Sequence, residues 1–118
     1  MSLRSDIAVV ILGTGLVACA AYPKPVERLA SAEASVRAAR EVDAAASPNG
    51  ALYLKYAEES LAEGRTRMAS GENARAEATL IRAAADAELA LAIARETAAR
   101  EQAISSLEQL RRLERRER

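Results

Sequence analysis

Neither glycine nor proline occurs in the 47 residues that follow Gly71. These two residues are the usual breakers of a helix, and the stretch is rich in alanine, arginine, glutamate and leucine, so it favours one uninterrupted α-helix. We expect this helix to run from Ala74 nearly to the end of the chain, with Asn73 as its N-cap. At ~1.5 Å per residue its length approaches ~65 Å, and this length constrains how the rest of the chain can fold.

Two shorter helices are expected before Gly71. The first is predicted over residues 25–46, and its apolar residues recur at three- and four-residue steps: Val26, Leu29, Ala32, Val36, Ala39 and Val42. The segment Ser47-Pro48-Asn49-Gly50, four turn-forming residues in a row, predicts the break after it. The second is predicted over residues 51–70, and Gly71, a residue that readily adopts a positive φ, is expected to end it. Tyr53 and Tyr56 flank its expected buried stripe, which consists of Leu54, Ala57, Leu61, Gly64 and Met68.

Alanine supplies 29 of the 118 residues, which predicts long helices around a thin core because each alanine buries little apolar area. The expected stripe of the third helix is Ala78, Ile81, Ala84, Ala85, Ala87, Leu91 and Ala94, followed by Ile104, Leu107, Leu110 and Leu113. The first two helices are about half as long as the third and can cover only its N-terminal part. We therefore predict an all-α fold: a three-helix antiparallel hairpin or bundle over residues 26–103, with a long, protruding C-terminal helix whose last part, residues 104–118, is a basic extension.

The start of the chain has a different composition. Residues 7–18 form a nearly continuous apolar run of 12 residues, too short to cross a bilayer as a helix but typical of the central region of a secretory signal peptide. The run ends in Leu16-Val17-Ala18-Cys19. These four residues resemble the lipobox of bacterial lipoproteins, in which three residues precede the cleavage site and the cysteine thiol then receives a diacylglycerol.

This resemblance implies that residues 1–18 are a signal peptide, that Cys19 carries fatty acids such as palmitate, and that residues 19–25 are an acylated tether. Two or three acyl chains together hold a protein firmly to a membrane. Ala20, in place of an aspartate after the cysteine, favours the outer membrane, with the body on the periplasmic face. The alternative is a short buried helix with an inert cysteine in the core.

A second resemblance covers residues 19–102. The lipobox, the proline-containing tether, the turn over residues 70–74 and the Ala-rich run over residues 83–92 together resemble an uncharacterised family of bacterial envelope lipoproteins. Its helical domain often stands ahead of an OmpA-like domain, but the resemblance indicates no peptidoglycan contact for this chain. Five residues also resemble the small-residue positions of one tetratricopeptide-repeat hairpin: Gly64, Gly71, Ala76, Leu80 and Ala83. This resemblance implies a close-packed helix pair rather than a repeat array.

Composition excludes several kinds of chemistry. With no histidine and one cysteine, the chain cannot form an internal disulfide, a zinc site built on those residues, or a histidine-based catalytic site. Its 17 basic and 17 acidic residues balance, so no nucleic-acid partner is indicated. The remaining candidates are the carboxylate pairs Glu58 with Glu59 and Asp86 with Glu88, but neighbouring charges on a helix usually form a solvated face. We expect no enzyme activity, no cofactor and no metal site.

The end of the chain is the most informative part for partners. Its arginines Arg111, Arg112, Arg115 and Arg116 suit either a basic contact with a partner or an exposed helix end balanced by glutamates. The apolar stripe Ile104, Leu107, Leu110 and Leu113 has no cover within one copy, so self-association as a coiled coil, or an envelope-protein partner, would bury it. The leading hypothesis is a membrane-anchored structural or interaction lipoprotein. The alternative is a small periplasmic binding module that holds a peptide or lipid between the first two helices.

Overall fold

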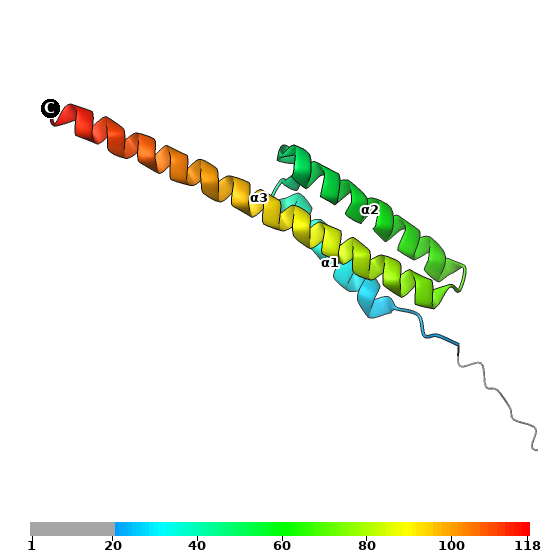
Figure 1. Ribbon diagram of the computed structural model, residues 1–118. Coiled ribbons are helices and arrows are strands. Elements are labelled where there is room, and N and C mark those ends of the chain that lie inside the picture. Colours follow the sequence, from blue (N-terminus) through cyan, green and yellow to red (C-terminus); the bar gives the residue numbers. More distant parts are fainter. Residues whose placement is uncertain (1–20) are drawn as a thin grey trace, which may run out of the picture.

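The computed structural model describes residues 21–118. These residues form three α-helices and one short 3-10 helix: α1 (Val26–Glu41), η1 (Ala44–Ala46), α2 (Pro48–Ala69) and α3 (Asn73–Arg116). In Figure 1, α1 and α3 begin at the same end of the bundle and run in the same direction, while α2 returns antiparallel to both. The part of the chain that the structure describes contains no strand, so the predicted all-α fold is confirmed.

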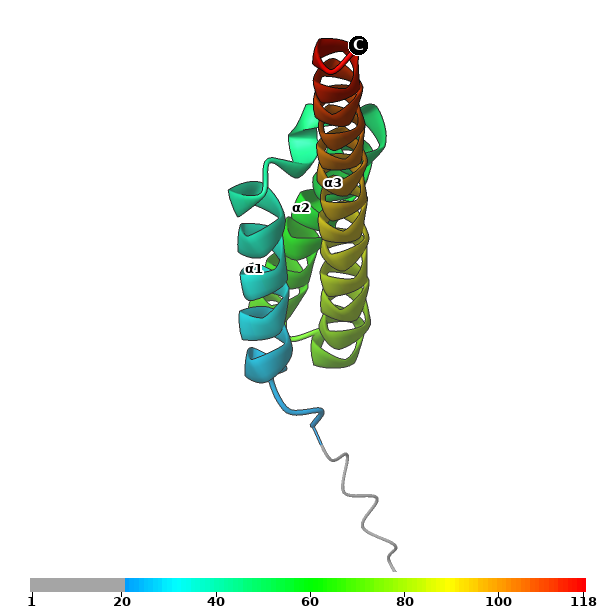
Figure 2. The same ribbon diagram turned by 90° about the vertical axis from the view of Figure 1, so that its left-hand side faces the viewer.

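The N-terminal part of α3 is the helix on which both others pack, and the three stand side by side in Figure 2. Eight of the twelve buried apolar residues of the core are alanines. The largest fully buried side chain is that of Leu80. A core of this kind lets helices approach closely but buries little area per residue, so its stability depends on tight contacts rather than on large side chains.

The connection between α1 and α2 differs from the prediction. The chain leaves α1 at Glu41 and reverses at Asp43, whose φ of 52° lies in the left-handed region. The predicted break at residues 47–50 is instead the start of α2: Ser47 is the N-cap, and its hydroxyl accepts a hydrogen bond of 3.1 Å from the Gly50 amide. Pro48 is the first helical residue, where its fixed φ and missing N–H are well tolerated.

Two glycines of α2 allow other segments to approach closely. A Cβ atom on Gly50 would lie 2.1 Å from the carbonyl oxygen of Ala44 in η1. A Cβ atom on Gly64 would lie 2.6 Å from Cδ2 of Leu80 in α3. The expected close-packed pair of α2 and α3 is therefore present, and Gly71 ends α2 with a φ of 80°, as predicted.

The start of α3 also differs from the prediction. Glu72 occupies the N-cap position and Asn73 is already helical. The Asn73 amide does not cap the helix but donates a hydrogen bond of 2.7 Å to the backbone carbonyl of Tyr22. A contact with the tether, 51 residues away in the sequence, therefore takes the place of the predicted cap.

The predicted stripes were correct for α2 and wrong in part for the other two helices. Val26 and Val42 are exposed, at 61% and 42%, because they lie at the two ends of α1. On α3 the buried residues are Ala76, Leu80, Ala83, Ala87 and Ala90. Of the residues predicted to be buried on that helix, Ala78, Ile81 and Ala85 are exposed. The physical reason is that α3 carries apolar residues on two opposite faces, which the predicted stripe had merged.

The C-terminal part of α3 leaves the bundle, as predicted. Every residue from 98 to 118 is exposed. In Figure 1 this segment continues straight beyond the ends of α1 and α2, on the side away from the tether. We call residues 98–118 the projecting segment.

Candidate functional site

The predicted lipidation site cannot be placed in the fold. Leu16, Val17, Ala18 and Cys19 lie outside the described residues, so the lipobox stays a prediction from the sequence. The structure does show where the tether meets the body, because its last residues, 21–25, are described.

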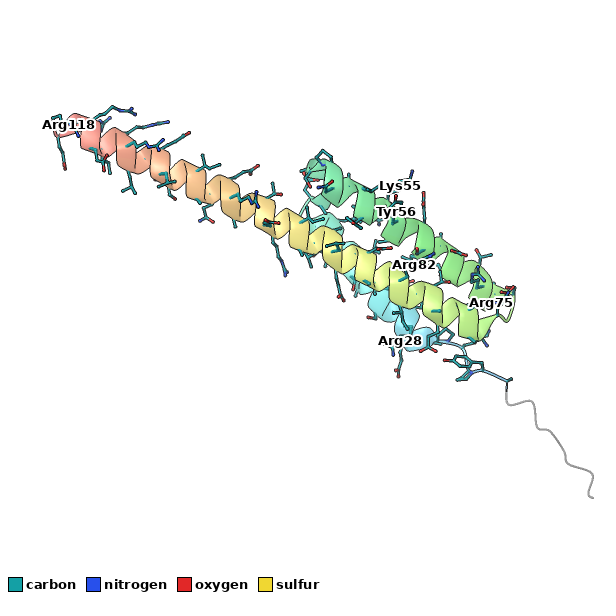
Figure 3. The ribbon with its side chains drawn as sticks, viewed as in Figure 1. Arg28, Lys55, Tyr56, Arg75, Arg82 and Arg118 are labelled. Carbon is teal, nitrogen blue, oxygen red and sulfur yellow. The ribbon has the colours of Figure 1, made fainter. Side chains whose placement is uncertain are left out.

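Tyr22 holds the tether against the start of α3. Its hydroxyl donates a hydrogen bond to the carboxylate of Glu77, and its backbone carbonyl accepts the hydrogen bond from Asn73. Arg28 of α1 donates to the other oxygen of the same carboxylate at 3.3 Å, and Figure 3 shows its side chain at this end of the bundle. The tether, α1 and α3 therefore meet at Glu77, at the end opposite the projecting segment.

These contacts shift the proton equilibria of two groups. The hydrogen bond from Tyr22, reinforced by Arg28, lowers the pKa of the Glu77 carboxyl. The hydrogen bond to Glu77 raises the pKa of the Tyr22 hydroxyl, since deprotonation would place two negative oxygens side by side. Both shifts favour a neutral tyrosine that donates to an ionised carboxylate.

The predicted partner-binding residues all lie on the projecting segment. Ile104, Leu107, Leu110 and Leu113 are 55–58% exposed, so the expectation that one copy leaves them uncovered is confirmed. Arg111, Arg112, Arg115 and Arg116 are exposed as well, and Arg112 pairs with Glu108 at 3.9 Å. Figure 3 shows the side chains of this segment extending freely in all directions as far as Arg118.

The four apolar residues do not form one line along the helix. Three residues turn an α-helix by ~300°, so each step from Ile104 towards Leu113 moves the side chain back by ~60°. Ile104 therefore lies on roughly the opposite side from Leu113, among the arginines. Leu107, Leu110 and Leu113 form the apolar side of the segment.

That apolar side continues along the whole of α3. Residues two positions apart on a helix point ~200° apart, so Ala78, Ala85 and Ala92 lie opposite the buried Ala76, Ala83 and Ala90. The exposed apolar residues on this side recur at steps of three or four, interrupted only by Glu96: Ala74, Ala78, Ile81, Ala85, Leu89, Ala92, Ala99, Ala103, Leu107, Leu110 and Leu113. We call this set the outer face of α3. Sequence reasoning missed it as a separate surface, although its 3.6-residue period is visible in the sequence.

The hollow beside Tyr56 is polar and lies between α2 and α3, not between the first two helices, where the binding-module alternative expects its ligand. Tyr53 packs partly buried against the core, with its ring edge-on to that of Tyr56 at 6.2 Å between centroids. Tyr56 is 44% exposed beside an open hollow between α2 and α3. The other residues that line this hollow are Glu59, Ser60, Glu63, Arg82 and Asp86. Such a lining does not match an apolar ligand.

The acidic pairs do not converge on one point. Glu58 forms an ion pair with Arg40 at 2.7 Å, and Glu59 forms one with Lys55 at 3.7 Å. Asp86 and Glu88 are two positions apart on α3, so they point to different sides of the helix. Among residues 21–118, no group of three or more histidine, cysteine, aspartate or glutamate residues is placed to hold a metal ion.

Within the same range, no helix has the length and apolar character needed to span a bilayer. Comparisons of the chain with protein-family models, curated proteins and solved structures find no match. The structure itself defines the class: a small three-helix bundle with one helix extended well beyond the other two.

Proposed function

We propose that this chain is a lipid-anchored, non-catalytic lipoprotein of the bacterial envelope that acts as a structural or protein-interaction module. In this proposal Cys19 is acylated and the body lies on the periplasmic face of the outer membrane. Helix α3 provides the docking surface. The lipobox resemblance and the resemblance to Ala-rich envelope lipoproteins support the location.

The observation that carries the docking role is the placement of the projecting segment. It is exposed throughout, it bears three leucines on one side, and it lies at the end of the bundle opposite Tyr22. Large exposed apolar patches commonly mark a surface that a partner covers. With a tether of ~20 Å and a helix of ~65 Å, the tip of α3 can reach ~85 Å from the lipid surface.

The anchor is tested by labelling with radioactive palmitate in a bacterial host. The wild-type chain should be labelled and recovered with the membrane fraction, whereas Cys19→Ser should lose the label. Ala20→Ser is the matched control, because it changes the next residue and leaves the acceptor thiol intact. Label that persists in Cys19→Ser would contradict the anchor.

The docking role is tested by truncation after Glu101. The body should keep its thermal stability, because the residues removed are all exposed. Chemical crosslinking in intact envelopes should yield adducts of the full chain that the truncated chain loses. Equal adducts from both chains would assign docking to another surface and contradict the proposal.

A further inference from the structure

We propose that the outer face of α3 binds the same face of a second copy of this chain, with the two helices antiparallel and Ala92 at the two-fold axis. The inference rests on the proposed docking role, for which it names the partner, but it does not depend on the lipid anchor.

The outer face offers an area close to that of a small dimer interface. Its five large side chains, Ile81, Leu89, Leu107, Leu110 and Leu113, are each 41–56% exposed. Counting ~80 Å² for each of these and ~40 Å² for each exposed alanine, one copy offers about 650 Å², and the pair about 1,300 Å². Specific interfaces of standard size begin at about 1,200 Å² in total, so the face approaches that size only if it is covered along nearly its whole length.

Only a partner as long as α3 can cover nearly the whole outer face. The order of large and small residues along that face fits a second α3. In an antiparallel pair centred on Ala92, residue i lies opposite residue 184 − i, within one position. The facing residues are then Leu110 with Ala74, Leu107 with Ala78, Ile81 with Ala103, Ala85 with Ala99, and Ala92 with itself. Three of the five large side chains, Ile81, Leu107 and Leu110, meet an alanine, whereas Leu89 meets Glu96 and Leu113 extends past the start of the partner's α3. Without Leu113 the pair buries about 1,100 Å², an area typical of a weak dimer. No large side chain meets another, so the helix axes can stay close along the contact.

A parallel pair lacks this match. Each residue would then face its own copy, so leucines would meet leucines near the C-terminus and alanines would meet alanines near the middle. The spacing between axes would then change more along the contact than in the antiparallel pair, where alanine meets alanine at the centre and leucine meets alanine at the ends. The antiparallel arrangement also places opposite ends of the helix dipoles together.

Charges on one edge of the face agree with the antiparallel register. On the edge towards α1, Glu88 of one copy lies next to Arg95 of the other, and the two-fold axis repeats this pair. Neither residue has an ion-pair partner within residues 21–118, so both are free for this contact.

On the edge towards α2, Arg82 of one copy approaches Arg100 of the other. Repulsion there is weakened because each arginine already holds a carboxylate of its own copy. Arg82 pairs with Glu63 at 3.4 Å, and Arg100 pairs with Glu96 at 2.6 Å. Figure 3 shows Arg82 on the α2 side of α3.

The first test is analytical ultracentrifugation of the full chain carrying Cys19→Ser, which removes the acylation site. We expect a dimer with a micromolar dissociation constant. Leu110→Glu should raise that constant by about 100-fold or more, because it places a carboxylate opposite Ala74 twice per dimer. Ile104→Glu is the matched control: Ile104 is equally exposed but lies ~120° around the helix, so the dimer should persist. A monomer at all concentrations, or equal loss in both variants, would overturn the inference.

The second test fixes the direction of the pair by disulfide crosslinking in the Cys19→Ser background. A mixture of Ala74→Cys and Leu110→Cys chains should give the mixed dimer, and Ala92→Cys should crosslink to itself, because these Cα atoms come within the reach of a disulfide. Glu108→Cys, on the opposite side of α3, should remain monomeric. Efficient self-crosslinking of Leu110→Cys without the mixed product would show a parallel pair and overturn the antiparallel register.

A membrane surface could also cover the outer face of α3, because a helix with leucines on one side and arginines on the other suits the boundary between lipid and water. The same chain is therefore mixed with vesicles of phosphatidylethanolamine and phosphatidylglycerol. A monomer in solution that binds these vesicles and loses binding in Leu110→Glu would assign the face to lipid and overturn the dimer. That result would leave the palmitate test of the anchor unaffected, so the two proposals fail separately.

Discussion

Replacing Gly64 with alanine should destabilise this protein, although alanine is the better helix former. On an exposed helix the change from glycine to alanine stabilises by about 1 kcal/mol. Gly64, however, is buried in the last third of α2. A Cβ atom built there lies 2.6 Å from Cδ2 and 2.8 Å from Cγ of Leu80, well inside van der Waals contact.

The size of the effect follows from how little Leu80 can move. Its side chain is 0% exposed and packs within the core shared by all three helices. Adding one carbon to a packed core costs about 1–3 kcal/mol, and a fully buried neighbour places this case in the upper half of that range. After the gain in helix propensity, we expect a net loss of about 1–2 kcal/mol, or a fall of roughly 5–15 °C in Tm for a domain of this size.

Thermal unfolding followed by far-ultraviolet circular dichroism measures this change. Ala62→Gly, at an exposed position of the same helix, isolates the propensity effect and should cost about 1 kcal/mol. Combining Gly64→Ala with Leu80→Ala should cost clearly less than the sum of the single changes, because the second substitution removes the atoms in the way. A Tm that rises in Gly64→Ala would refute the close approach of α2 and α3.

Two further predictions concern the two ends of the bundle. Ser47→Ala should destabilise by about 1 kcal/mol in urea unfolding, because Ser47 caps α2 through the Gly50 amide, whereas Ser106→Ala in the projecting segment should change nothing. At the tether, the lowered pKa of Glu77 means that its contact with Tyr22 is complete above the ordinary carboxyl pKa and weakens as the pH falls through the lowered value. The raised pKa of Tyr22 means that the same contact persists up to about pH 10 and is lost as the pH rises through the raised value. In NMR titrations Tyr22→Phe should move the Glu77 midpoint upwards; an unchanged midpoint would show that the hydroxyl is not the cause.

The features that could be predicted from the sequence are those with local causes. The long α3 follows from the absence of glycine and proline after Gly71, and the end of α2 follows from the positive φ that Gly71 adopts. The projecting segment follows from simple length, since neither shorter helix can reach its end. Gly64 was expected to let α2 and α3 pack closely, and the structure places the Leu80 side chain against it.

The buried face of α3 could not be read correctly, because alanine gives no contrast between inside and outside. With alanines at positions 74, 76, 78, 83, 84, 85, 87, 90 and 92, several helical stripes fit equally well. The choice between them depends on where α1 and α2 pack, and that is decided by few large residues. Leu80, which is fully buried, was not included in the predicted stripe, whereas the exposed Ile81 was.

The tether contact was missed for another reason. Tyr22 reaches Asn73 and Glu77 across 51 and 55 positions of the sequence, and no local pattern connects such distant residues. Asn73 before an alanine-rich helix is a normal capping signal, so the prediction followed the local preference. The tertiary contact with the Tyr22 carbonyl overrode it.

The position of the tether determines what pairing through α3 would do to an anchored protein. In the antiparallel pair, Asn73 of one copy lies opposite Arg111 of the other, so the two N-terminal ends of α3 are separated by 38 residues, or about 57 Å. Tyr22 holds each tether at that end, and the two tethers are therefore separated by a similar distance. If both copies are anchored in one bilayer, α3 must lie along the membrane surface, whereas a single copy is free to stand with the projecting segment away from it. Association through the outer face would thus change the height of the body above the membrane, and a distance measurement from Arg118 to the lipid surface should distinguish the two states.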